Sequence, residues 1–214
     1  MRILISNKLM WRVLLADLAS GFGTAVSGAL YIFVASAYFK LPEQASIALL
    51  FYFLTSFLAM PMWLNLAYRV GKDTALKIAL VYAVVINLGL LLVAEEGNVA
   101  VLWGFTIAFG VAFGAAPTLL RSMMADLTDE DTLRTGQQRA GLFFALLTTT
   151  NKLGAALAVG ASFAILEIVF DFVPGGDNAQ SALDGLLVTY ALGTAGGLFI
   201  AFIALIGYLL NKQA

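Results

Sequence analysis

Long apolar runs separated by short polar stretches divide the chain into six segments. A helix needs about 20 apolar residues to cross a hydrocarbon core of about 30 Å, because each residue rises about 1.5 Å. Helices are expected rather than open strands, since lipid offers no partners to backbone groups. The expected spans are Trp11–Phe39, Gln44–Tyr68, Thr74–Ala94, Asn98–Met124, Ala140–Phe170 and Gly185–Leu210. The pattern therefore predicts an all-α integral membrane protein, with one six-helix domain over residues 1–214.

Basic residues gather in alternate loops and predict the orientation of these spans. Positive side chains near short loops stay on the cytoplasmic side of a membrane. One set of loops and helix ends carries Arg2, Lys8, Arg12, Arg69, Lys72, Lys77, Arg121, Arg134, Arg139 and Lys212, whereas the opposite loops carry only Lys40. We therefore expect both termini in the cytoplasm, and the protein in the cell (inner) membrane.

Composition narrows the classes of function. Hydrophobic residues make up 61% of the chain and charged residues 12%, and the mean hydropathy is +0.93, so the lipid bilayer is the expected surroundings. A net charge of −1 offers no basic face to nucleic acid. The absence of cysteine and histidine removes thiolate nucleophiles and the usual zinc, haem and iron–sulfur sites. We expect no enzyme activity, no metal site and no resident cofactor.

Lys152 is a charge near the middle of the fifth span. A lysine at the centre of a membrane helix costs about 2.5–3.5 kcal/mol, so such residues face a bundle interior or a wet cavity. Thr148 lies one helical turn before it, and Thr149 and Asn151 flank the same position. The pattern predicts a substrate-binding or coupling site at Lys152, Thr148 and Asn151. The alternative is a purely structural pair between Lys152 and a carboxylate such as Asp17.

Asp17 in the first span has two interpretations. It lies five residues after Arg12, so it could sit at the membrane interface and pair with that arginine or with the next loop. It could also lie deeper and contribute to the Lys152 site. Both interpretations remain open, and Asp17 is kept among the candidate coupling residues.

The polar stretch Ala125–Gly141 suggests a second kind of site. Its four carboxylates, at Asp126, Asp129, Glu130 and Asp131, are similar to an aspartate-rich motif that holds diphosphate through magnesium in membrane transferases. Such chemistry needs a second acidic cluster across the site, and Asp73 stands alone. We therefore favour a solvated loop with salt bridges at the helix ends over a magnesium-dependent transferase.

Three stretches resemble the C-terminal half of the glycoside-pentoside-hexuronide:cation symporters of the major facilitator superfamily. "YRVGKD" (Tyr68–Asp73) is similar to the short Gly-Lys loop between the second and third helices of that half. "MMADLTDEDTLRTGQQRAG" (Met123–Gly141) is similar to the family's cytoplasmic loop. Lys152 follows this loop at the spacing of the family's lysine in its eleventh helix.

The resemblance implies one 3+3 inverted-repeat half of a twelve-helix fold. It implies half of a cation-coupled sugar symporter working by alternating access, with sodium or a proton as coupling cation and a second half or a second copy as partner. Lys152 and Thr148 would face the central cavity. The implied cytoplasmic gate comprises Gly71, Lys72, Asp126, Asp129, Arg134 and Arg139. The alternative is an orphaned or truncated half that binds or assembles without transport, and the sequence identifies neither the solute nor the cation.

Overall fold

The computed structural model describes residues 8–208 of the 214-residue chain. Arg2, Lys212 and the expected end of the last span at Leu210 lie outside this range. The described part is helical, and six of its helical stretches are long and apolar enough to cross a membrane. The elements are α2 (Lys8–Phe33), the π-helical turn η1 (Val34–Tyr38), α3 (Pro42–Val70), α4 (Lys72–Val93), α5 (Val99–Phe113), α6 (Ala115–Thr135), α7 (Ala140–Phe170) and α8 (Gln180–Ala204).

The fourth stretch differs from its expected form at both its middle and its end. It breaks at Gly114 into α5 and α6, and Pro117 follows in the first turn of α6, where a proline is tolerated. The indole Nε1 of Trp63 donates to the carbonyl of Val111 at 2.6 Å, just before the break. The helix then continues beyond the expected end at Met124.

The region expected as a loop from Ala125 is therefore mostly helix. α6 runs to Thr135, where Gly136 ends it with a left-handed φ of +69°. Its polar residues mark a polar continuation of the helix rather than a change to irregular structure. The last helix also differs from expectation, because it begins at Gln180, five residues before Gly185.

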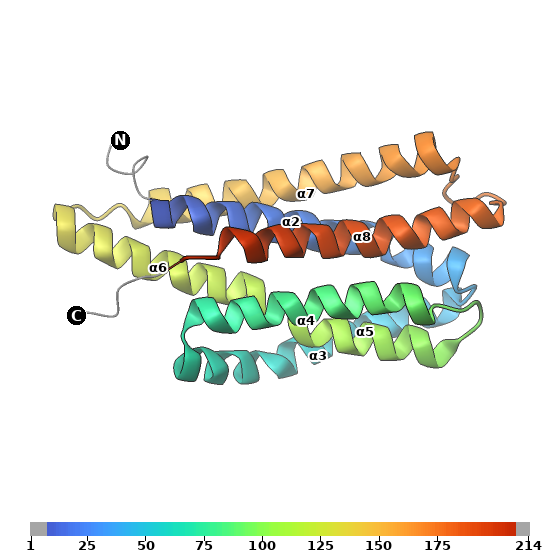
Figure 1. The fold of residues 1–214 in the computed structure, drawn as a ribbon, viewed down its shortest axis with the longest axis horizontal. Coiled ribbons are helices and arrows are strands. Elements are labelled where there is room, and N and C mark those ends of the chain that lie inside the picture. Colours follow the sequence, from blue (N-terminus) through green and yellow to red (C-terminus); the bar gives the residue numbers. More distant parts are fainter. Residues whose placement is uncertain (1–7, 209–214) are drawn as a thin grey trace.

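Two groups of three helices make up the bundle. α2 packs along its length against α7 and α8, while α5 packs against α3 and α4. Figure 1 shows α7, α2 and α8 in the upper part and α3, α4 and α5 in the lower part, and the contact between α4 and α8 joins the two groups. Along the chain, α2, α3 and α4 form one triplet, and α5 with α6, α7 and α8 form the other. The first helix of each triplet packs against the second and third helices of the other triplet. This exchange is the arrangement of a 3+3 repeat.

Glycines allow the closest helix contacts. A Cβ added at Gly154 of α7 would collide with the backbone of Leu18 in α2, and one at Gly197 of α8 would lie 2.5 Å from the amide nitrogen of Gly23. A Cβ at Gly110 of α5 would lie 2.6 Å from the carbonyl oxygen of Tyr52. Close backbone approach supplies packing energy in lipid, where no hydrophobic force acts between helices.

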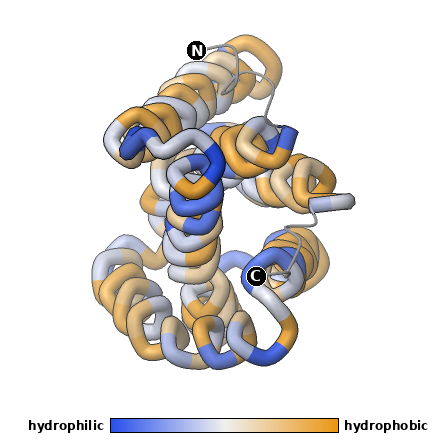
Figure 2. Tube along the Cα trace, turned by 90° about the vertical axis from the view of Figure 1, so that its left-hand side faces the viewer, coloured by the Kyte–Doolittle hydropathy of each residue, from blue (hydrophilic) through white to orange (hydrophobic). Residues whose placement is uncertain are grey.

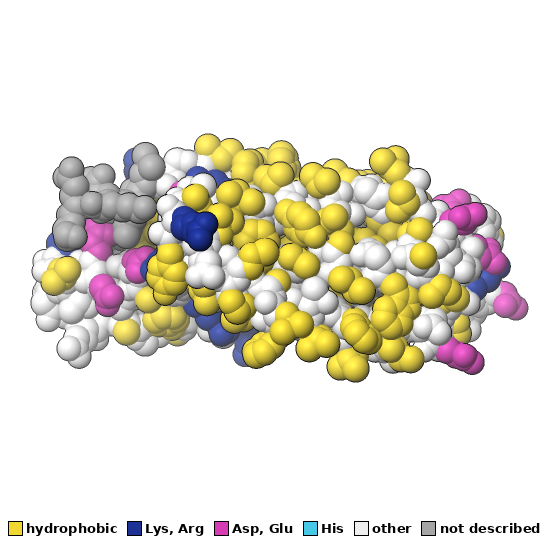
Figure 3. Space-filling model, turned by 90° about the horizontal axis from the view of Figure 1, so that it is seen from below, with side chains coloured by type: hydrophobic (Ala, Val, Ile, Leu, Met, Phe, Trp, Pro, Cys, Tyr) yellow, Lys and Arg dark blue, Asp and Glu magenta, His cyan; other side chains and the backbone are white. Residues whose placement is uncertain are grey.

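Charged side chains lie toward the two ends of the bundle. Figure 3 shows hydrophobic side chains across the middle, most lysines and arginines together with acidic side chains toward one end, and mainly acidic side chains at the other end. At that other end Lys40 forms an ion pair of 2.5 Å with Glu96. Figure 2 looks at the end where α6 meets α7, and its near helix ends carry the hydrophilic residues. The distribution is that of a multi-pass membrane protein.

Candidate functional site

Asp17 is buried in the contact between α2 and α7. The residue is only 4% exposed, and its carboxylate accepts hydrogen bonds from Thr150 Oγ1 at 3.1 Å and from Asn151 Nδ2 at 3.4 Å. Gly21, one turn further along α2, lies directly against Asn151, so the two backbones meet closely here. Within the described residues Asp17 forms no ion pair, so the salt bridge that the interfacial interpretation offered is not present. Thr150, which sequence reasoning did not include in the site, is one of its partners.

Arg12 does not pair with Asp17. Its guanidinium Nη1 instead donates to the carbonyls of Ala204, at 3.2 Å, and Ile206 at the end of α8. The carbonyl end of a helix carries partial negative charge and lacks intrahelical donors, so an arginine is stabilising there. Arg12 thus ties the start of α2 to the end of α8.

Lys152 lies on the outward side of α7. It is exposed, and within residues 8–208 no ion pair reaches its ammonium group. It precedes by two residues Gly154, which is pressed against α2, so its side chain leaves α7 on nearly the opposite side. The alternative of a structural pair between Lys152 and Asp17 is therefore wrong. Asn151 is also exposed, but its side-chain amide reaches Asp17, while Lys152 points away from α2.

Small and polar residues form a continuous outward face on α7. They recur every three or four residues, and all are exposed: Gly141, Ala145, Thr149, Lys152, Ala156 and Gly160, which we call the α7 polar face. Thr148 is exposed beside it. By contrast Leu153 and Leu157, on another side of the same helix, are large, apolar and 52% and 60% exposed. Helix surfaces that face lipid carry large apolar side chains such as these two leucines. Surfaces that meet another helix or a water path carry small and polar side chains, as the α7 polar face does.

The connection between α3 and α4 is joined to α6 by an ion pair. Gly71 separates the two helices with a positive φ of +94°, a conformation that favours glycine. Lys72 Nζ, at the start of α4, contacts both carboxylate oxygens of Asp126 at 2.6 and 2.7 Å. Both side chains are about one third exposed, so solvent screens the pair. The structure thus brings together three of the residues assigned to the gate by resemblance.

A second ion pair joins the end of α6 to the start of α7. Arg139 donates from Nε to Asp131 Oδ2 at 3.0 Å and from Nη2 to Oδ1 at 2.7 Å, in the fork geometry that suits a carboxylate. Asp131 is buried, with its side chain 4% exposed. Asp131 was recognised in the acidic cluster but not included in the gate. Asp129 and Arg134 are exposed on the same helix, and no ion pair involves them within the described residues.

The acidic cluster does not gather around one point. Asp126 is held by Lys72 and Asp131 by Arg139, on different elements. Within residues 8–208 no group of three carboxylates is placed to hold a metal ion. Two of the four carboxylates of the suggested diphosphate-binding motif, Asp126 and Asp131, therefore serve contacts between helices.

A cavity that sequence reasoning missed lies between α2, α3, α5 and α8. It has a volume of about 90 Å³, and aromatic rings and hydroxyl groups share its wall. Its lining includes Ser27, Tyr31, Tyr52, Phe105, Thr106 and Tyr190. These residues come from four helices that are separated along the chain, so no local sequence motif predicts the cavity.

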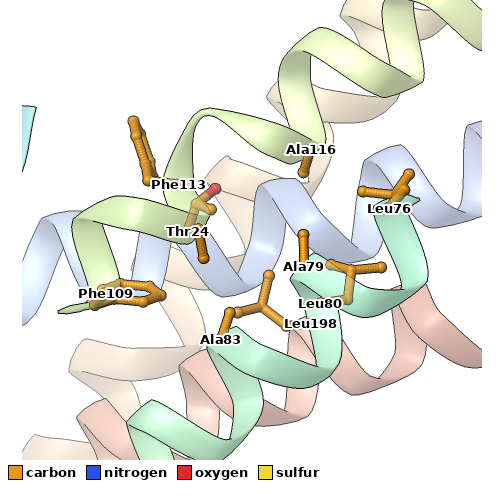
Figure 4. A pocket seen from close by; sticks show the side chains of 10 residues that line it. Thr24, Leu76, Ala79, Leu80, Ala83, Phe109, Phe113, Ala116 and Leu198 are labelled. Carbon is orange, nitrogen blue, oxygen red and sulfur yellow. The ribbon is translucent and has the colours of Figure 1, made fainter. Parts of the chain in front are cut away.

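A smaller apolar void adjoins this cavity. Figure 4 shows Leu76, Ala79, Leu80 and Ala83 of α4 facing Phe109 and Phe113, with Thr24 supplying the hydroxyl oxygen in the view. The volume is about 10 Å³, close to the minimum for one water molecule. Thr24 donates to the carbonyl of Ser20 at 2.9 Å, and its hydroxyl is therefore already engaged. We assign this void to packing.

Known proteins match the chain as follows. The family model described as "MFS/sugar transport protein" covers residues 1–212. An uncharacterized symporter of Synechocystis sp. is 29% identical over 161 residues, which is 74% of this chain and 29% of that protein. The sodium-dependent lysophosphatidylcholine symporter 1-A of Danio rerio is 31% identical over 106 residues, which is 49% of this chain and 20% of that protein.

These matches decide the class of protein. The matched segments span less than a third of the length of either relative. The family model and both relatives are described as transport proteins or symporters, so the transferase interpretation of the Asp126–Asp131 cluster is wrong. Together with the six membrane-spanning helices, the match over residues 1–212 shows that this chain belongs to the MFS/sugar transport family of the major facilitator superfamily.

Proposed function

We propose that the chain is one six-helix half of a cation-coupled symporter that carries a sugar-like solute by alternating access. The half pairs with a second half or with a second copy of itself, and the substrate path runs between them. Both termini lie in the cytoplasm of a cell whose inner membrane holds the protein, because the lysines and arginines gather toward that end.

The observation that carries this proposal is the α7 polar face with Lys152 at its centre. An ammonium group at mid-membrane is costly against acyl chains, and Lys152 has no carboxylate partner within the described residues. In the most apolar stretch of α3, and likewise of α7, only 22% of the residues are buried inside the bundle, whereas the share is 56% in α2 and in α8. A second six-helix unit over α3 and α7 would cover this face and leave Lys152 beside water or an anion.

The coupling role follows from the chemistry of a buried ammonium. Such a group becomes tolerable when an anion lies near, and its cost rises when that anion is neutralised or removed. Lys152 therefore responds to carboxylates of the partner half and to the cation they bind. Thr148 and Asn151 place hydroxyl and amide groups next to it, and Asp17 holds Asn151 and Thr150 in position.

The cytoplasmic end supplies the gate. Lys72 with Asp126 and Arg139 with Asp131 brace the half internally, so this end moves as one body. Asp129 and Arg134 are exposed and available for ion pairs across to the partner half. Those crossing pairs form when the path opens outward and break when it opens inward.

The substrate class rests on the family description and on the names of the relatives. The family description names sugar transport, and the relatives are called symporters, one of them sodium-dependent. We propose a sugar-like solute, with sodium or a proton as coupling ion.

Solute uptake tests this function. Membrane vesicles with the chain are assayed for uptake or counterflow of radiolabelled sugars, and wild type is compared with Lys152→Ala and with Lys40→Ala. Lys40 is the matched control, because it pairs with Glu96 at the other end of the bundle. We expect the first substitution to abolish coupled uptake and the second to leave it unchanged.

Two outcomes would contradict the proposal. Unchanged uptake in Lys152→Ala removes the lysine from the mechanism. Absence of uptake from the chain, both alone and together with any second half, supports the alternative of a binding or assembly subunit without transport. Cross-linking in native membranes then distinguishes the partners, because self-pairing doubles the mass.

A further inference from the structure

The cavity between α2, α3, α5 and α8 has a rigid aromatic wall. Tyr52 contacts the rings of Phe109 and Phe113 at centroid distances of 5.7 and 4.9 Å, and Phe105 contacts those of Phe109 and Tyr190 at 5.8 and 5.9 Å. Such ring pairs stabilise one another beyond the area they bury. The wall therefore holds its shape, and the cavity of about 90 Å³ is preformed.

Most hydroxyl groups of the cavity are already engaged. Ser27 Oγ and the Tyr190 hydroxyl lie 3.1 Å apart in a hydrogen bond, and Tyr31 and Thr106 form another at 3.3 Å. Thr106 also donates to the carbonyl of Leu102 at 2.7 Å. These bonds use part of the hydrogen-bonding capacity of the wall, and one hydroxyl of the Ser27–Tyr190 pair keeps its proton available.

The Tyr52 hydroxyl is different. Tyr52 is only 8% exposed and lines the cavity, yet no hydrogen bond to its hydroxyl exists within residues 8–208. The Tyr52 hydroxyl is not among the enclosed polar atoms that lack a partner in residues 8–208, so a ligand atom or a water can reach it and supply the partner. The Tyr52 hydroxyl is thus the lining hydroxyl that no protein group engages within the described residues.

The lining excludes charged ligands. None of the twelve lining residues is acidic or basic, so a charged group entering the cavity would lose its hydration without compensation. The volume is also smaller than the apolar cavity of about 150 Å³ that accepts benzene. The space suits a branched alkyl group with one oxygen.

We propose that this aromatic cavity is a subsite for a small, uncharged, apolar substituent of the transported solute, with Tyr52 as its hydrogen-bonding residue. For a sugar-like solute the substituent is the alkyl group of a glycoside, and Tyr52 meets the oxygen that joins it to the ring. The assignment of the bound group to a transported solute rests on the proposed function.

Gly28 marks the mouth of the cavity. It is exposed, it lines the cavity, and a Cβ added there would meet nothing within 4 Å. Gly160 on α7 is equally exposed and open but does not line it. The chain contains no cysteine, so Gly28→Cys and Gly160→Cys each introduce a single thiol at a position that accepts it.

Thiol labelling tests the subsite without any transport assay. The purified full chain in detergent reacts with N-ethylmaleimide in the presence of tert-butanol, which is branched, uncharged and has one hydroxyl, or of glycerol as a polar control. We expect tert-butanol to slow labelling of Gly28→Cys about threefold, since five heavy atoms support only weak binding. Labelling of Gly160→Cys should not change, and glycerol should affect neither variant.

The Tyr52→Phe substitution adds the hydrogen-bond test. Added to Gly28→Cys, it should weaken the binding of tert-butanol about fivefold, so that labelling is slowed only about 1.4-fold, because one hydrogen bond is lost while the ring wall remains. Equal protection by tert-butanol and glycerol, equal slowing of the thiol at position 160, or full protection in the Tyr52→Phe background overturns the proposal.

Uptake measurements separate this subsite from the transport function. If the thiol at position 28 is protected but no sugar is transported, the binding site in the cavity is supported and the proposed transport function is contradicted. If a sugar is carried with no preference for its isopropyl glycoside and tert-butanol gives no protection, the function stands and the subsite is overturned.

Discussion

At the scale of single residues, burial separates two charges that the sequence presents as possible partners. Asp17 is enclosed between α2 and α7 and held by Thr150 and Asn151, while Lys152, the next residue after Asn151, is exposed on the far side of α7. One helical step of about 100° is enough to turn neighbouring side chains to different surroundings. Asp17 therefore positions α7, and Lys152 remains available to a partner.

Replacing Asp17 tests its positioning role. Asp17→Ala leaves Asn151 Nδ2 without its acceptor and removes the bond from Thr150. We expect a loss of about 1–3 kcal/mol in stability, seen as a lower melting temperature of the purified chain. Asp129→Ala is the control, since Asp129 is exposed. Equal melting temperatures for the two variants would contradict a positioning role for Asp17.

A similar test of stability applies to Arg139, where the end of α6 meets the start of α7. Arg139→Ala leaves the buried carboxylate of Asp131 without its two charged hydrogen bonds. We expect about 1–3 kcal/mol of destabilisation and faster proteolysis between α6 and α7. The exposed Arg134 gives the matched variant Arg134→Ala, for which neither change is expected. Similar proteolysis rates in both variants would show that the pair does not hold the two helices together.

At the scale of helices, glycine contacts set the distances between α2 and its neighbours. Gly154→Ala places a methyl group against the backbone of Leu18, whereas Gly160→Ala, on the same helix, meets nothing within 4 Å. Backbone cannot move aside as a side chain can, so we expect the first variant to lose about 1–3 kcal/mol. The second should keep the melting temperature of wild type or raise it slightly. Equal melting temperatures would contradict the close α2–α7 contact.

The sequence predicts the helices better than their breaks and contacts. Six apolar runs are readable because bilayer thickness imposes their length, and the six helices are confirmed. The break at Gly114 and the continuation of α6 to Thr135 are not readable in this way, because a polar helix outside lipid looks like a loop in a hydropathy pattern. Lys152 stands out as a charge within an apolar run, but its direction depends on which face of α7 meets α2.

The Tyr52 cavity shows a second limit of sequence reasoning. Its wall is formed by residues of α2, α3, α5 and α8. In the sequence around each of these residues, nothing distinguishes it from the other side chains of a membrane helix. Only the packing of four helices reveals that most hydroxyls pair with one another and that of Tyr52 does not. A site of this kind has no signature in residue spacing.

At the scale of the whole molecule, the two least buried helices, α3 and α7, lie at opposite edges of the bundle in Figure 1. α3 and α7 have few buried residues and do not pack against each other in the described part of the chain. α3 presents large apolar side chains, including Leu50 and Phe57 at 65% and 71% exposure, while α7 presents its polar face. We infer that a second six-helix unit covers both helices and that water reaches the α7 polar face between the two units.

Water access at position 152 tests this account most directly. Because the chain lacks cysteine, Lys152→Cys and Leu153→Cys each carry one thiol, on different sides of α7. In native membranes we expect a charged, water-soluble methanethiosulfonate reagent to modify the first variant and to leave the second unmodified, since Leu153 faces acyl chains. Modification of neither thiol, or of both at the same rate, would contradict a wet path beside Lys152 and with it the carrier function.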